Sequence, residues 1–98
     1  MNNERLDFTA EKFYELLRSQ QKRCPLTNRE LTPLSAEVEL RDPNKTEGRF
    51  AMENLYIVDK DLKFLCRHLS EVEIIELCGE VIEHRGKDFG ITIRRVKK

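Results

Sequence analysis

The chain has 98 residues, of which 39% are hydrophobic and 37% are charged. This length predicts one modest hydrophobic core, and this balance argues against a disordered chain. Lysine plus arginine equals aspartate plus glutamate at 18 each, so the chain lacks the basic excess of a dedicated nucleic-acid binder, although a local basic patch stays open.

No segment is apolar over the roughly 20 residues that a membrane span requires, and the start of the chain lacks a signal-peptide pattern. The cysteines are Cys24, Cys66 and Cys78. Their odd number and wide spacing indicate neither a disulfide framework nor a zinc pair. We therefore expect a cytoplasmic protein with no membrane partner, whose reduced thiols lie in or near the core.

The first helix is predicted over residues 9–23. Thr9 is a suitable N-cap, because its hydroxyl can accept a hydrogen bond from a first-turn amide. Phe8 and Phe13 are spaced as a hydrophobic staple across this cap. Pro25 cannot continue the helix and sets its limit.

A turn and two short strands are predicted next. Asn28 adopts a left-handed conformation at little cost, which indicates a tight turn within residues 24–31. Residues 36–40 alternate small or apolar with acidic side chains, as a half-buried strand does. Residues 42–48 are rich in breakers and charge and predict a loop, and residues 55–58 form a second apolar segment.

Two more helices and a strand complete the prediction. A helix is expected over residues 59–68, and another over 71–84, where Ser70 opens a capping box and Gly86 is a plausible terminator. Residues 89–95 alternate and predict a terminal strand. The elements together predict a small single α+β domain. The buried side of the last helix is expected to hold five residues: Ile74, Ile75, Cys78, Val81 and Ile82.

The order of these segments resembles the HNH endonuclease family over about two thirds of the chain. Residues 24–31, CPLTNREL, are similar to the family's CPLTG+xL segment, with Asn28 at the glycine position. Residues 36–43 lie over its AELDHIxP segment, residues 54–58 over NIxLV, and residues 69–70 over the usual LS. The resemblance implies an HNH-like ββα core over about 24–69, which in the family holds one divalent metal ion.

In that family a histidine on the first strand activates water, while an acid beside it and a histidine or asparagine on the helix bind the metal. The resemblance places Leu40 at the base position, Glu39 at the acidic ligand position and Lys63 at the helix ligand position. Leucine accepts no proton, and an ammonium group only donates hydrogen bonds and repels a cation. Asn54 holds the position that orders the loop. We therefore expect no catalytic residue, no metal and no cofactor. Either the Lys63 ammonium pairs with Glu39, or both charges stay solvated and do not meet.

The leading interpretation is a catalytically inactive HNH-like domain that binds nucleic acid or a protein partner. One alternative is a divergent metal-dependent DNA endonuclease that uses Glu39 and Asp42, and the other is a plain protein-interaction domain. His68 and His84 lie near predicted helix C-termini, which favour a solvated histidine over a ligand. The basic residues that could contact nucleic acid are Arg41, Lys63, Arg67, Arg94 and Arg95.

Overall fold

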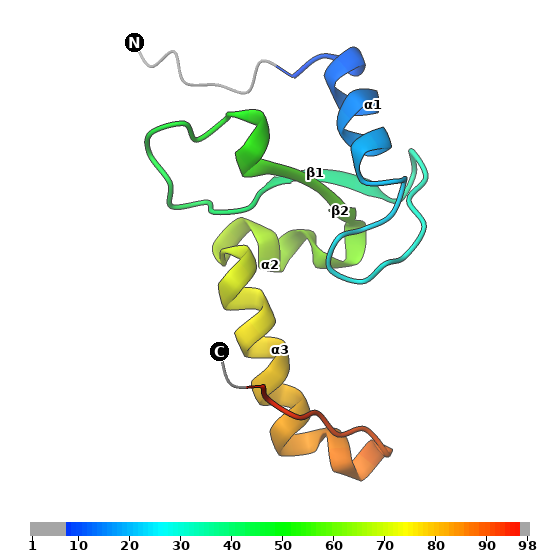
Figure 1. Ribbon diagram of the computed structural model, residues 1–98, viewed down its shortest axis with the longest axis vertical. Helices are drawn as coiled ribbons and strands as arrows, with labels where there is room; N and C mark the ends of the chain where they lie inside the picture. The colour runs from blue at the N-terminus through cyan, green and yellow to red at the C-terminus, as the bar shows by residue number, and fades with distance from the viewer. Residues whose placement is uncertain (1–7, 97–98) are drawn as a thin grey trace.

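A computed structural model describes residues 8–96 and shows an α+β fold (Figure 1). Strands β1 (Ala36–Leu40) and β2 (Leu55–Asp59) form an antiparallel sheet. Helix α1 (Ala10–Ser19) lies on one side of this sheet and helix α2 (Lys63–His68) on the other. Helix α3 (Glu71–Arg85) follows α2 and projects away from the sheet. None of the helices within the described residues is long and apolar enough to cross a membrane.

The start of α1 forms as its sequence predicts. The Thr9 side chain accepts a hydrogen bond from the Lys12 amide at 3.2 Å. The rings of Phe8 and Phe13 meet edge to face with centroids 6.4 Å apart, which confirms the hydrophobic staple across the cap.

The end of α1 lies at Ser19, four residues before the predicted limit. Gln21 and Lys22 adopt left-handed conformations, with φ of 56° and 58°, and these reverse the chain. The Gln20 side chain then pairs with the backbone of β2. Its Nε2 donates to the Ile57 carbonyl at 2.9 Å, and its Oε1 accepts from the Ile57 amide at 2.8 Å. One side chain thus covers part of an exposed sheet edge.

The turn at residues 24–31 is confirmed. Asn28 has a φ of 64°, and its amide donates to the Cys24 carbonyl at 2.8 Å. The Cys24 amide in turn donates to the Arg29 carbonyl at 2.8 Å. This turn brings the Cys24 side chain into the core beside the sheet. The core side chains are Leu16, Leu17, Cys24, Leu31, Leu55, Tyr56, Ile57, Val58, Cys66 and Ile74.

The helix predicted over 59–68 is α-helical only from Lys63, because it opens with a 3₁₀ turn over Lys60–Leu62. The Asp59 carboxylate caps this turn by accepting from the Asp61 amide at 3.0 Å. This delayed start sets which α2 residues face the sheet.

The predicted capping box at the start of α3 is confirmed. The Ser70 hydroxyl accepts from the Glu73 amide at 3.2 Å, and the Glu73 carboxylate accepts from the Ser70 amide at 2.8 Å. Both hydrogen bonds satisfy backbone amides that have no acceptor within the helix.

The predicted buried side of α3 is mostly wrong. Ile74 is buried, but Cys78 is exposed, and Ile75 and Val81 are 57% and 54% exposed. The reason is that α3 leaves the body of the protein after its first turns (Figure 1). The Cα radius of gyration, 15.3 Å, accordingly exceeds the value of about 13 Å for a compact chain of 100 residues.

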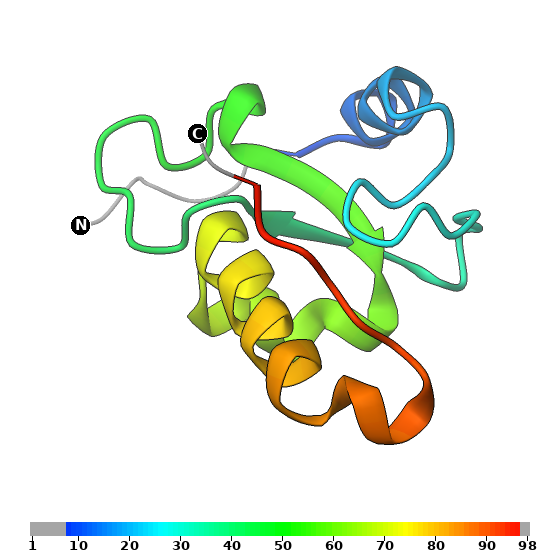
Figure 2. The same cartoon turned by 60° about the horizontal axis from the view of Figure 1, so that its bottom comes forward.

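The predicted terminal strand at 89–95 is also wrong. A 3₁₀ turn over Gly86–Phe89 is followed by Gly90 at a φ of 78°, and the chain then runs back along α3 without joining a sheet (Figure 2). We call residues 91–96 the C-terminal strap. Gly86 is required here, because a Cβ at this position would lie 2.5 Å from the Ile91 carbonyl oxygen.

Candidate functional site

Glu39 lies between the sheet and α2. Alternation along β1 directs Glu39 to one face of the sheet and Leu40 to the other. Glu39 stands opposite Tyr56 of β2 and is only 8% exposed. Leu40 packs against the core. The two positions that the family resemblance assigns to a metal ligand and a base therefore face different environments.

The partner of Glu39 is Arg67. The Arg67 Nε lies 3.6 Å from the Glu39 Oε2, where a buried carboxylate meets a half-exposed guanidinium. Burial raises the pKa of Glu39, and the positive charge of Arg67 partly opposes this effect. The chain itself therefore supplies the cation next to Glu39, which is the Arg67 guanidinium.

The expected pairing of Lys63 with Glu39 is wrong. The Lys63 ammonium lies 5.5 Å from the centroid of the Phe64 ring, and it affects Glu39 only through a weak coulombic attraction. Lys63 is the first residue of α2, whereas Arg67 lies one turn later on the same face. This spacing of four residues was the signal for Arg67 that the sequence contained, because it puts both cations on the face of α2 that carries Lys63.

Tyr56 and Cys66 form a buried polar contact next to Glu39. The Tyr56 hydroxyl oxygen lies 3.5 Å from the Cys66 Sγ. Burial raises the pKa of both side chains, so both stay protonated near neutral pH. A protonated, buried thiol is a poor nucleophile, and we assign no catalytic role to this pair.

Arg41 lies over the ring of Tyr56. Its guanidinium lies 4.7 Å from the centroid of the Tyr56 ring, and its Nη1 donates to the Glu71 carboxylate at 2.8 Å. The ion pair joins the end of β1 to the start of α3. Arg41 is therefore engaged by an aromatic face and a carboxylate at the same time.

Asn54 is 4% exposed and holds the loop between the strands. Its Oδ1 accepts from the Asp42 amide at 3.2 Å, and its Nδ2 donates to the carbonyls of Asp42 at 3.3 Å and Arg49 at 2.8 Å. All three bonds satisfy backbone groups, so this asparagine orders the loop that leaves β1.

The residues present do not fit a divalent cation. Within residues 8–96, no group of three or more His, Cys, Asp or Glu side chains converges where a metal ion could be held. Arg67 pairs with Glu39, while the Glu37 carboxylate and the Lys63 ammonium act on it through coulombic interactions alone, so Glu39 has a cationic partner rather than a set of converging ligands. The Asp42 carboxylate accepts from the Asn44 amide at 3.0 Å, and His68 and His84 are exposed.

Three of the five basic residues predicted to contact nucleic acid are bound to carboxylates. Arg67 pairs with Glu39 and Arg41 with Glu71. Arg95 contacts Glu83 at 2.5 Å and Glu76 at 2.9 Å, both on α3. The other two differ: Lys63 lies over the Phe64 ring, and Arg94 is exposed.

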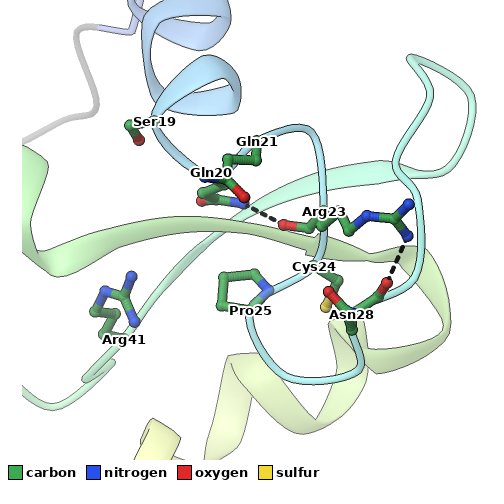
Figure 3. A pocket seen from close by; sticks show the side chains of 8 residues that line it. All are labelled: Ser19, Gln20, Gln21, Arg23, Cys24, Pro25, Asn28 and Arg41. Carbon is green, nitrogen blue, oxygen red and sulfur yellow. Dashed lines mark hydrogen bonds between the residues drawn. The ribbon is translucent and has the colours of Figure 1, made fainter.

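A groove of about 330 Å³ lies between the end of α1 and β1 (Figure 3). Arg23 and Arg41 stand on opposite sides of it. The Arg23 Nη1 donates to the Asn28 carbonyl at 3.0 Å. The groove is lined by Ser19, Gln20, Gln21, Arg23, Cys24, Pro25, Asn28 and Arg41.

Comparisons of the chain with protein-family models, with curated proteins and with solved structures find no match. The function must therefore be argued from the residues and their geometry.

Proposed function

We propose that this chain is a catalytically silent HNH-like domain that acts as a binding module. The observation that carries the proposal is the ion pair between Glu39 and Arg67. It puts a guanidinium beside the carboxylate that would serve as a metal ligand. Leu40, at the position of the general base, is a hydrocarbon that packs against the core and cannot take a proton from water.

The geometry favours a protein as the bound partner. Phosphate binding needs arginines and lysines whose charge is available to the ligand. On the ββα unit, Arg41 and Arg67 are instead neutralised by Glu71 and Glu39. Large apolar side chains are exposed on α3, with Val72 at 70% and Ile75 at 57%. Exposed apolar surface of this kind is typical of protein contacts.

Nucleic-acid binding is the second candidate function, and the groove between α1 and β1 is the observation that favours it. Arg23 lines that groove without a carboxylate partner among the ion pairs of the described residues, and Arg41, on its other side, would contact a phosphate only by leaving Glu71. Such binding would weaken steeply as salt rises, because counterions are released from the nucleic acid.

Two measurements on the purified chain test the proposal. Supercoiled plasmid and single-stranded DNA are incubated with magnesium, manganese, nickel or zinc, and we expect no cleavage, because loss of a general base costs on the order of 100- to 10,000-fold in rate. Metal-dependent nicking that is lost in Glu39→Ala would overturn the proposal and favour a working endonuclease.

The second measurement is a fluorescence-anisotropy titration with labelled DNA and RNA at low and at physiological salt. We expect no saturable binding. Tight, salt-sensitive binding that Arg23→Ala weakens and Lys45→Ala leaves intact would instead establish the groove as a nucleic-acid site, since Lys45 lies in the exposed loop away from the groove.

A further inference from the structure

The backbone groups of β1 divide between its two edges. In an antiparallel pair, every second residue directs its amide and carbonyl to the partner strand, and the residues between them direct theirs outward. The Lys60 amide donates to the Ser35 carbonyl at 2.8 Å. At the other end of the pair, the Arg41 amide donates to the Asn54 carbonyl at 2.8 Å. With the register of the two strands, these bonds leave three residues of β1 whose backbone groups point away from β2: Ala36, Val38 and Leu40.

The outer edge of β1 is unpaired, unlike that of β2. On β2 the outward amide and carbonyl of Ile57 are bound by the Gln20 side chain. Among residues 8–96, no group forms a hydrogen bond with the outward amides and carbonyls of β1. Four of the five β1 residues are also partly exposed, whereas all five of β2 are buried. The outer edge of β1 is therefore a template on which a further strand can pair.

The side chains of β1 set the chemistry of a strand added at this edge. Val38 and Leu40 share the face of the sheet that packs against the core. Glu37 and Glu39 share the opposite face. Glu39 pairs with Arg67, but Glu37 has no ion pair within the part of the chain that the structure describes. An added strand would set apolar side chains beside the first face and basic side chains beside the second.

The two glutamates also disfavour a second copy of β1 as the added strand. Glu37 already repels Glu39 through a coulombic interaction within the chain. If two copies of β1 paired edge to edge, the glutamates of one would face those of the other on the same side of the sheet. Like charges opposite each other on neighbouring strands are destabilising, whereas a lysine or arginine at that place is attracted. The charges thus select a basic segment.

We propose that the outer edge of β1 binds an extended peptide of alternating apolar and basic residues as a third strand of the sheet. The inference rests on the proposed function of a binding module and names the class of segment that the module binds. In this mode of recognition the backbone hydrogen bonds supply affinity, and the alternate side chains supply specificity.

Amide hydrogen exchange of the native chain tests whether the edge is free. The amides of Val38 and Leu40 point outward and should exchange quickly, whereas those of Glu37 and Glu39 face β2 and should be protected. A bound peptide should slow exchange at Val38 and Leu40. Slow exchange at these two amides without peptide would show that the edge is already covered and would overturn the inference.

Fluorescence anisotropy at physiological salt measures binding of a labelled peptide of alternating valine and lysine that matches β1 in length. We expect saturable binding by the native chain. Glu37→Lys should weaken it about fivefold, because attraction across the strands becomes repulsion. The matched control is Glu47→Lys, the same change on the exposed loop between the strands, which should leave binding unchanged. Circular dichroism checks that both variants are folded. No saturable binding, or equal effects of the two changes, overturns the inference.

Methylation of the peptide amides tests strand pairing without any change to the protein. Alternate amides of a bound strand face the neighbouring strand. Methylation of one alternate set should therefore abolish binding, and methylation of the other set should leave it intact. Equal effects of the two sets would overturn the inference, because the peptide would not be bound as a strand. None of these measurements involves DNA or a metal ion, so failure here is distinguishable from failure of the proposed function.

Discussion

The Arg67 guanidinium lies 3.6 Å from the carboxylate of Glu39, in the space between β1 and α2. If the chain has the proposed HNH-like core, this is the space that a metal ion would occupy, and the chain places a cation there from its own helix. The carboxylate of the pair is buried, whereas the guanidinium is 52% exposed. The cost of removing the carboxylate from water offsets much of the attraction, so the pair fills the site but adds little to the stability of the fold. Its consequences for pH and for metal binding are measurable.

Glu39→Gln should change how stability depends on pH. Burial raises the pKa of Glu39, so the folded state holds this proton more tightly than the unfolded state. The native protein therefore loses stability as pH rises from the ordinary carboxyl range through the raised folded pKa, and the variant lacks this loss. We expect Glu39→Gln to gain stability relative to the native protein between acidic and neutral pH.

Urea unfolding at both pH values measures this difference, with Glu47→Gln, on the exposed loop between the strands, as the control. A Glu39→Gln variant that is equally destabilised at both pH values would show instead that its bond to Arg67 outweighs the cost of burial.

Asn54→Ala should destabilise the protein by about 2–4 kcal/mol, because it leaves buried backbone groups of the 42–49 loop without partners. Asn44→Ala, on the exposed part of the same loop, should change the free energy of unfolding by less than about 0.5 kcal/mol. Urea denaturation measures both variants. Equal effects of the two changes would refute the assigned role of Asn54.

One of the three thiols should react quickly with an aromatic disulfide reagent. Cys78 is exposed, whereas Cys24 and Cys66 are buried, and burial raises the pKa of the Cys66 thiol and keeps it protonated. The Cys78→Ser variant should lack the fast phase. A fast phase that persists would mean that one of the buried thiols is accessible.

Arg95→Ala should release the C-terminal strap from α3. Arg95 contacts Glu83 through two nitrogen atoms and Glu76 through a third, and its hydrogen bond lowers the pKa of Glu83. This interaction is therefore present above the ordinary glutamate pKa and is lost as pH falls through the lowered value. Exchange of the Ile91 amide, which donates to the Gly86 carbonyl at 2.9 Å, should quicken in the variant, and Arg94→Ala should leave it unchanged. Equal exchange in native protein and Arg95→Ala would show that other contacts hold the strap.

The parts of the fold that depend on neighbouring residues could be predicted from the sequence. The cap at Thr9, the capping box at Ser70 and the left-handed Asn28 each involve residues a few positions apart. The bounds of β1 were predictable for the same reason, since alternation is a local pattern. The early end of α1 was not, because left-handed conformations at Gln21 and Lys22 carry no glycine signal.

The parts that depend on distant contacts could not be predicted. Alternation at residues 89–95 favoured a strand, but Gly90 reverses the chain, and Arg95 pairs with Glu83, 12 residues earlier. The apolar pattern of α3 indicated burial, but α3 leaves the body of the protein after its first turns, so most of that face is exposed. At the candidate site the sequence identified Glu39 but not its partner, because Lys63 and Arg67 lie on the same face of α2 and only the docking of α2 on the sheet decides which of them reaches Glu39.

The most direct test of the central claim is the melting temperature of the native chain with and without magnesium, manganese or zinc. A metal that binds the folded state raises the melting temperature. Because Arg67 occupies the side of Glu39 where a metal would bind, we predict no rise for the native protein. A metal-dependent rise that is lost in Glu39→Gln would contradict the account, because it would show that Glu39 still holds a metal ion despite Arg67.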